Sequence, residues 1–145
     1  KKNWEKIKLE NGRKSVLEGV PKSLPAMVKA TRIQDKARGV GFDWENVNQV
    51  FEKVKEEFTE LHDEVIIKNN KTKVEKEFGD VLFSLINYAR FIGVDPELAL
   101  ERTNKKFISR FSFLEKEVNR KGLNLDSMSL EEMDNIWDES KKKHP

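Results

Sequence analysis

One run of apolar residues, between Val47 and Val65, constrains the fold of this chain more than any other feature. Its members follow one another at alternating spacings of four and three residues: Val47, Phe51, Val54, Phe58, Leu61 and Val65. That spacing places them on one face of an α-helix. Asp43 stands before Trp44 in the position of an N-cap, so we expect the helix to begin there. This is the strongest helix signal in the chain.

A helix is expected on each side of this run. The first should extend from Ser23 to about Arg38, because a proline in its first turn is tolerated and two glycines follow it. The polar residues 68–71 interrupt the apolar pattern after the central helix. Thr72 can cap the next helix, whose apolar stripe ends at Ile92, just before a glycine.

Two more helices are expected in the C-terminal third. Residues 95–97 combine a capping aspartate, a proline suited to the first helical position and a glutamate near the positive end of the helix dipole. They open a helix that should reach about Asn119. Ser129 and Glu132 match a capping box, which predicts a short last helix over about 130–142.

No segment alternates with a period of two for long enough to predict a strand. The expected fold class is therefore all-α, with a four-helix-bundle-like core of antiparallel helices and a short C-terminal helix. Residues 1–23 are polar and contain Gly12, Gly19 and Pro21, so we interpret them as an N-terminal arm or linker. Residues 24–145 form the expected domain.

Composition excludes several classes of function. The 145 residues fit one domain, and a net charge of +2 with interspersed signs argues against nucleic acid or a membrane surface as a partner. Cysteine is absent, which excludes disulfides, thiolate metal sites and cysteine nucleophiles and fits the cytoplasm. No apolar run approaches the roughly 20 residues of a membrane span. The chain begins with Lys1, so we expect it to be part of a longer protein.

Two pairs of acids carry the main functional hypothesis. Glu57 and Glu60 stand one turn apart on the central helix, and Glu77 and Asp80 repeat this i, i+3 arrangement on the next one. Four carboxylates can therefore converge between two helices. Such a concentration of negative charge favours a bound cation, and hard oxygen ligands suit Mg²⁺ or Mn²⁺.

A less specific interpretation is that these acids only solvate helix faces in a non-catalytic interaction module. The apolar neighbours Val54, Phe58 and Phe78 argue against it, because they place the acids at the edge of a buried seam. A redox bundle holding iron would need Glu-x-x-His pairs. Both histidines lack a glutamate three residues before them, so that motif is absent.

Basic and aromatic residues complete the pattern. Lys106 and Arg110 share one face of the fourth helix, Trp137 and Lys141 share one face of the last, and Lys73 stands one turn before Glu77. Each alone is better explained as a solvated surface charge or, for Trp137, as a core residue. Cations and a flat ring beside a metal site describe a nucleotide.

Several motifs resemble one family. Glu56-Glu57-x-x-Glu60 followed by Glu77-x-x-Asp80 is similar to the signature of the MazG-type all-α nucleoside triphosphate pyrophosphohydrolases. The similarity extends to Lys36-Ala-Arg38-Gly-Val-Gly-Phe-Asp-Trp44, Gly79-Asp80-Val-Leu-Phe-Ser-Leu-Ile-Asn87-Tyr-Ala-Arg90 and Asn104-Lys-Lys-Phe107-x-x-Arg110-Phe111. Over about residues 15–142, the chain resembles the catalytic, C-terminal half of two-domain MazG proteins.

The resemblance implies Mg²⁺-dependent hydrolysis of a nucleoside triphosphate to the monophosphate and pyrophosphate, with water as the nucleophile, by a cytoplasmic homodimer. It implies four metal ligands: Glu57, Glu60, Glu77 and Asp80. It implies five residues around the nucleotide: Lys73, Lys106, Arg110, Trp137 and Lys141. The acids of the first motif, Glu56, Glu57 and Glu60, are the catalytic candidates, and Glu56 either orients a water or faces solvent.

Overall fold

The computed structural model describes residue 12 and residues 15–145. The chain divides into two compact units, one ending at Glu97 and the other beginning at Leu98. Every regular element of the described residues is helical, which confirms the all-α class. None of these helices is both long and apolar enough to cross a lipid bilayer. That all the helices share one core, and that a domain begins at residue 24, stay predictions.

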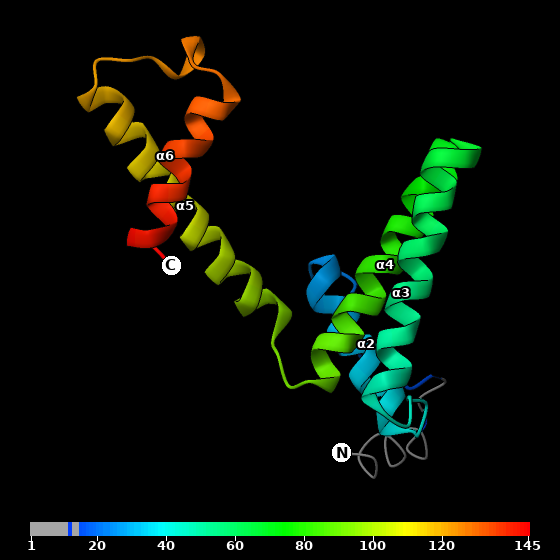
Figure 1. Ribbon diagram of the computed structural model, residues 1–145. Helices are drawn as coiled ribbons and strands as arrows, with labels where there is room; N and C mark the ends of the chain where they lie inside the picture. Colours follow the sequence, from blue (N-terminus) through cyan, green and yellow to red (C-terminus); the bar gives the residue numbers. More distant parts are fainter. Residues whose placement is uncertain (1–11, 13–14) are drawn as a thin grey trace. The chain divides into compact units, whose positions relative to one another are not determined.

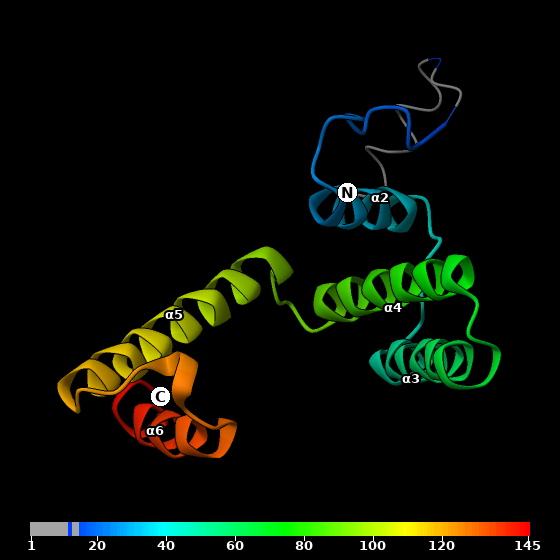
Figure 2. The ribbon, with the colours of Figure 1, turned by 90° about the horizontal axis from the view of Figure 1, so that it is seen from above.

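The expected N-terminal arm falls partly on residues 1–11, 13 and 14, which lie outside the described residues. Residues 15–25 form turns without a regular element. The first unit then contains α2 (Ala26–Gly39), α3 (Val47–Asp63) and α4 (Lys71–Phe91). Helices α3 and α4 lie side by side as a hairpin, and α2 packs against α4 (Figures 1 and 2). The buried apolar side chains of this unit are Ala30, Val50, Val54, Val81 and Ile86.

Helix α3 begins three residues later than predicted, and its cap is Asn46 rather than Asp43. The Asn46 side chain accepts a hydrogen bond from the Gln49 backbone N–H at 3.1 Å, and the Gln49 side chain accepts in return from the backbone of Asn46. This reciprocal capping box satisfies two N–H groups that a helix start leaves open. Asp43 is free for another role, described below.

The cap of α4 was also misplaced by sequence reasoning. Asn70, and not Thr72, accepts hydrogen bonds from the backbone N–H groups of Thr72 and Lys73, at 3.2 and 3.3 Å. Asn69 before it is left-handed, with φ of 50°. Asparagine tolerates this conformation better than most residues, so the pair of asparagines both reverses the chain and starts the helix.

A π-helical turn, η1 (Glu64–Lys68), follows α3. Its wider hydrogen bond joins the Asn69 N–H to the Glu64 carbonyl at 2.7 Å, and the extra residue in the turn shifts the helix register. Glu64 is buried, at 4% exposure, because it continues the helical spacing of Val50, Val54 and Glu57, whereas Val65 is 43% exposed. Val47, Phe51 and Phe58 of the expected apolar stripe are also 39–48% exposed, so the buried face of α3 is rotated from that stripe.

The second unit contains most of α5 (Pro96–Arg120), the short 3-10 helix η2 (Leu125–Ser127) and α6 (Leu130–Lys143). The start of α5 confirms the predicted cap, because the Asp95 carboxylate accepts from the Glu97 N–H at 3.0 Å. The capping box of Ser129 and Glu132 is also confirmed.

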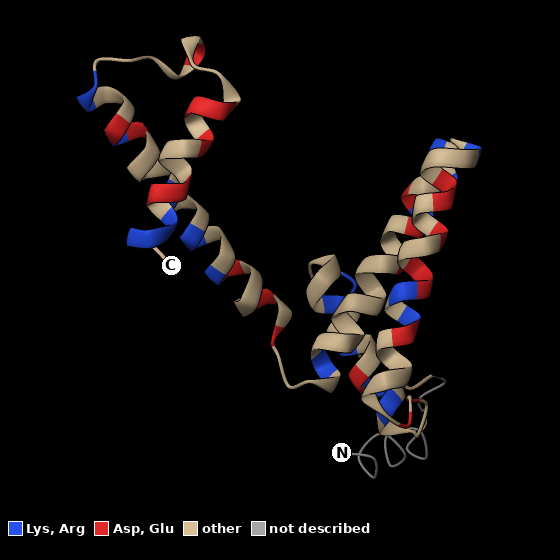
Figure 3. Cartoon of the chain, viewed as in Figure 1, with Lys and Arg blue, Asp and Glu red and all other residues tan. Residues whose placement is uncertain are grey.

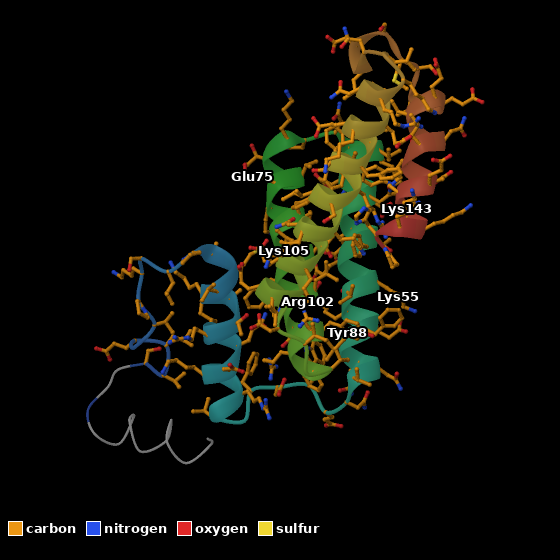
Figure 4. All side chains as sticks on the ribbon, turned by 90° about the vertical axis from the view of Figure 1, so that its left-hand side faces the viewer. Lys55, Glu75, Tyr88, Arg102, Lys105 and Lys143 are labelled. Carbon is orange, nitrogen blue, oxygen red and sulfur yellow. The ribbon has the colours of Figure 1, made fainter. Side chains whose placement is uncertain are left out.

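A small apolar core joins α5 and α6. Its buried members are Leu114, Val118 and Ile136, and five half-buried side chains pack against them: Phe113, Leu125, Met128, Met133 and Trp137. Lys143, labelled in Figure 4, lies over the Phe113 ring at 5.1 Å from its centroid. Even the polar Ser140 is fully buried in this unit.

Candidate active site

The α3–α4 hairpin brings three of the four predicted metal ligands together. Carboxylate oxygens of Glu57 and Glu60 on α3 and of Glu77 on α4 all lie within 4.8 Å of one another. The i, i+3 spacing places the first two on one side of α3, and the packing of the hairpin supplies the third. Figure 3 shows acidic residues along both helices of the hairpin.

Two oxygens of this group are buried without a partner. Glu57 is 7% exposed, and its Oε2 and the Oε2 of Glu77 have no hydrogen bond among the described residues. Burying a carboxylate oxygen in this way is unfavourable unless a cation compensates for the lost water. The donor set is therefore chemically suited to a hard divalent cation such as Mg²⁺.

Lys53 supplies the only positive charge within salt-bridge distance of these acids in the described part of the chain. Its Nζ lies 2.9 Å from Glu57 Oε1 and 3.5 Å from Glu56 Oε1. The hydrogen bond to Glu57 is the main cause that raises the pKa of Lys53. Sequence reasoning did not include Lys53 in the site, although its i, i+4 spacing to Glu57 is a signal that was available.

The charge of one lysine does not neutralise the group, as Glu60 shows. Its pKa is raised above the ordinary value, first by the negative charge of Glu57, then by loss of surrounding water and by the charge of Glu77. A carboxylate that is repelled by its neighbours binds a cation more favourably than an isolated one.

The fourth predicted ligand, Asp80, is not part of the three-carboxylate group. It lines a cavity of about 780 Å³ together with Glu57. The structure thus places the acidic cluster at the edge of a hollow large enough for a small molecule.

Five segments form the walls of this cavity: the turn at Leu17, helix α2, the loop 41–44, helix α3 and helix α4. Arg90, whose side chain is 9% exposed, fixes the loop to α4 through Asp43, with Nη2 2.8 Å from Oδ1. The same guanidinium donates to Asn87 Oδ1. This is the role that Asp43 takes in place of the expected helix cap.

At the mouth of the hairpin, aromatic and basic groups pack on one another. The rings of Phe51 and Tyr88 lie 5.7 Å apart, and Lys55 Nζ lies 5.2 Å from the Phe51 centroid. Lys55 on α3 and Tyr88 on α4 are labelled in Figure 4. These contacts join the two helices that carry the acids.

Two other predicted residues of this unit lie outside the cluster. Glu56 is exposed and lines a second cavity of about 380 Å³ with Lys53 and Trp44. Lys73 is exposed on the first turn of α4. Their predicted roles as catalytic and substrate-binding residues stay predictions.

The remaining four predicted residues belong to the second unit. Lys106 is exposed on α5, and Lys141 Nζ lies 3.8 Å from Asp138 Oδ1. Arg110 Nε donates to the His144 carbonyl at 2.8 Å. Trp137 is half-buried against the core of this unit, with its ring 5.2 Å from that of Phe107. Their roles toward a nucleotide stay predictions.

Sequence reasoning missed the polar residues of the large cavity, above all Gln34 and Asn87. Gln34 is 6% exposed and lies on the same helix face as Ala30. A polar residue in register with an apolar stripe was an available signal. Asn87 belongs to a motif that resembles the MazG family, but the orientation of its amide depends on Arg90.

Several known proteins resemble this chain in sequence. Residues 45–112 match the model of the MazG nucleotide pyrophosphohydrolase domain. The chain is 40% identical over 143 residues to a nucleoside triphosphate pyrophosphohydrolase/pyrophosphatase MazG of Thermotoga maritima. It is 38% identical over 144 residues to a nucleoside triphosphate pyrophosphohydrolase of Escherichia coli K12, and 47% identical over 143 residues to the uncharacterized protein YabN of Bacillus subtilis.

These alignments cover 96–97% of the chain. The chain spans about half the length of the first two relatives, 54% and 55%, and 29% of YabN. The matched region contains α3 and α4 with all the clustered acids. Residues 45–112, which include the clustered acids, therefore match the MazG nucleotide pyrophosphohydrolase domain.

Proposed function

We propose that this domain hydrolyses nucleoside triphosphates to the monophosphate and pyrophosphate. The observation that carries the proposal is the convergence of Glu57, Glu60 and Glu77 on one point, with two of their oxygens buried and unpartnered. Two relatives are named for this activity, and the domain model that matches residues 45–112 is named for nucleotide pyrophosphohydrolysis.

Glu57, Glu60 and Glu77 would hold Mg²⁺, with Asp80 as a fourth ligand; Mn²⁺ would fit the same oxygens. When bound, the cation supplies Lewis-acid stabilisation of the charge on the phosphate oxygens. Lys53 keeps one Glu57 oxygen oriented through its 2.9 Å contact. Glu56, exposed beside Lys53, is the acid left to orient the attacking water or accept its proton as pyrophosphate leaves the α-phosphorus.

Five residues are proposed to surround the nucleotide: Lys73, Lys106, Arg110, Trp137 and Lys141.

We also propose a homodimer. The apolar side chains Phe58, Phe78 and Leu82 on the hairpin, which are 37–54% exposed, are consistent with a covered face in an assembly. Light scattering tests this point, and a monomeric mass at micromolar concentration with full activity would contradict it. A cytoplasmic location stays a prediction.

The test of the activity is pyrophosphate release from a panel of ribo- and deoxyribonucleoside triphosphates, with Mg²⁺ and with a chelator. Equimolar monophosphate and pyrophosphate that form only with the cation would support the proposal. Absence of turnover on the whole panel, by a protein that melts cooperatively, would favour the non-catalytic interaction module instead.

A further inference from the structure

The large cavity contains polar groups that the proposed metal chemistry does not use. Its lining is mainly apolar, with Ile33, Val50 and Phe83 among the walls. Gln34 and Asn87 also line it, on two facing helices, α2 and α4. An apolar hollow with a few fixed polar groups is the usual form of a small-molecule site.

The orientation of the Asn87 amide follows from its neighbour. Arg90 donates to Asn87 Oδ1 from Nε at 3.2 Å and from Nη2 at 2.7 Å. Because a guanidinium can only donate, the atom that faces Arg90 must be the amide oxygen. The Asn87 NH₂ group therefore has no hydrogen bond among residues 12 and 15–145. It is an unused donor on the cavity wall.

Gln34 offers a hydrogen-bond acceptor, whereas Asn87 offers a donor. Its Nε2 donates to the Phe83 carbonyl at 2.9 Å, so its Oε1 is the atom left for another partner. That oxygen is buried and has no hydrogen bond within the described chain. A buried acceptor without a partner is costly, and a ligand that donates to it would remove the cost.

We propose that this cavity is the base-recognition pocket and that Asn87 and Gln34 read the edge of the nucleobase. The ligand group would be a planar heterocycle that presents a hydrogen-bond acceptor to the Asn87 NH₂ and a donor to Gln34 Oε1. Trp44 in the cavity wall supplies an aromatic surface for such a ring. Since Glu57 and Asp80 line the same cavity, the base would enter beside the proposed metal ligands.

Arg90 is a positioning residue in this scheme. It orients Asn87, and through Asp43 it holds the loop that carries Trp44. This inference rests on the proposed function, because it names the specificity pocket of that reaction.

The variant that tests the Asn87 donor most directly is Asn87→Asp. An aspartate keeps an oxygen for Arg90 but deletes the NH₂ donor. Gln34→Met removes the acceptor with little change in volume. Asn119→Ala, an exposed amide at the end of α5, is the matched control. Melting curves of all three variants establish that they fold.

The kinetic test compares nucleoside triphosphates with methyl triphosphate, which lacks a base. The wild type should prefer at least one nucleotide, and Asn87→Asp should lower kcat/KM for it by at least about tenfold relative to methyl triphosphate. The added negative charge affects both substrates, so their ratio isolates base recognition. Unchanged ratios in both cavity variants would overturn the inference.

A second readout does not depend on turnover. Side-chain amide signals of Asn87 and Gln34, assigned by their loss in the variants, should shift in the NMR spectrum when a nucleoside without phosphates is added in chelator. The Asn119 signal should not move. Should no triphosphate be hydrolysed at all, the proposed function fails, and these amide shifts alone decide on the pocket. Their absence at millimolar nucleoside would refute it.

Discussion

Glu60, which is exposed, and Glu117, which is half-buried, lie on long helices, one in each unit, yet their pKa values move in opposite directions. The pKa of Glu117 is lowered, chiefly by the hydrogen bond from Arg120 one turn away, with Nη2 2.8 Å from Oε2. Glu60 faces Glu57 and Glu77, and its pKa is raised. The charge of Glu117 is neutralised within its own helix, whereas Glu60 belongs to a group of acids that still needs a cation.

The two units also differ in what their polar residues do. In the second unit, α5 and α6 close over a compact apolar core, and the buried Ser140 donates to a backbone carbonyl of its own helix. Among the described residues of the first unit, four buried oxygens lack a partner, those of Gln34, Glu57, Glu64 and Glu77. Unsatisfied groups of this kind are rare in structural cores, so they support the proposal that the cation binds in the first unit.

The largest effect expected from this comparison is on turnover. Glu60→Gln, or Asp80→Asn, should lower activity by about 10³-fold, because each deletes a charged ligand of the proposed cation. Glu117→Gln, the matched change in the second unit, should leave activity unchanged. Pyrophosphate release at saturating Mg²⁺ measures this, and near-wild-type turnover of the Glu60 or Asp80 variant would remove that residue from the site.

The next effect concerns stability in the second unit. Trp137→Ala should cost about 3 kcal/mol, the lower end of the range for a truncated tryptophan, because the ring is only half-buried against Leu114, Val118 and Ile136. Thermal unfolding in the absence of nucleotide gives the value. A variant that melts like the wild type but has a raised KM would assign Trp137 to the nucleotide instead of the core.

Cation binding should stabilise the first unit. Added Mg²⁺ at 100 times its dissociation constant should raise the free energy of unfolding by about 2.7 kcal/mol. The shift in Tm should persist in Glu117→Gln and be lost in Glu60→Gln. Equal shifts in both variants would show that the cation binds elsewhere on the chain.

The smallest effect is a difference in pH dependence, measured in chelator. Because the folded pKa of Glu117 is lowered, its stabilisation is present above its unfolded pKa and is lost as pH falls through the folded value. The raised pKa of Glu60 has the opposite sign: its contribution to stability declines as pH rises from the unfolded pKa through the folded value.

Urea titrations between pH 3 and 7 compare the two variants. Glu117→Gln should flatten the loss of stability in acid, and Glu60→Gln should make the cation-free protein more stable near neutrality. Parallel pH profiles for both variants would show that the two glutamates do not differ as described.

Local sequence signals determined much of this protein. Apolar spacing together with cap, proline and glycine signals predicted α2 to α6, but not η1 or η2. The caps at Asp95 and Ser129 were correct, because capping depends on residues only two or three positions apart. The acid pairs were also readable, since i, i+3 neighbours share a helix face wherever the helix lies. The caps at Asp43 and Thr72 failed because a better-placed asparagine competed nearby.

Only the tertiary structure decided which polar groups lose their water. The packing of α3 on α4 brings Glu77 within 4.8 Å of acids 17 and more positions earlier in the chain. The buried face of α3 contains Val50, Glu57 and Glu64, whereas Val65 of the predicted apolar stripe is exposed. Arg90 pairs with Asp43, 47 positions earlier in the chain. The same guanidinium donates to Asn87 and so fixes the orientation of its amide. Burial and hydrogen bonding between distant segments depend on packing, and a local pattern of residues does not contain that information.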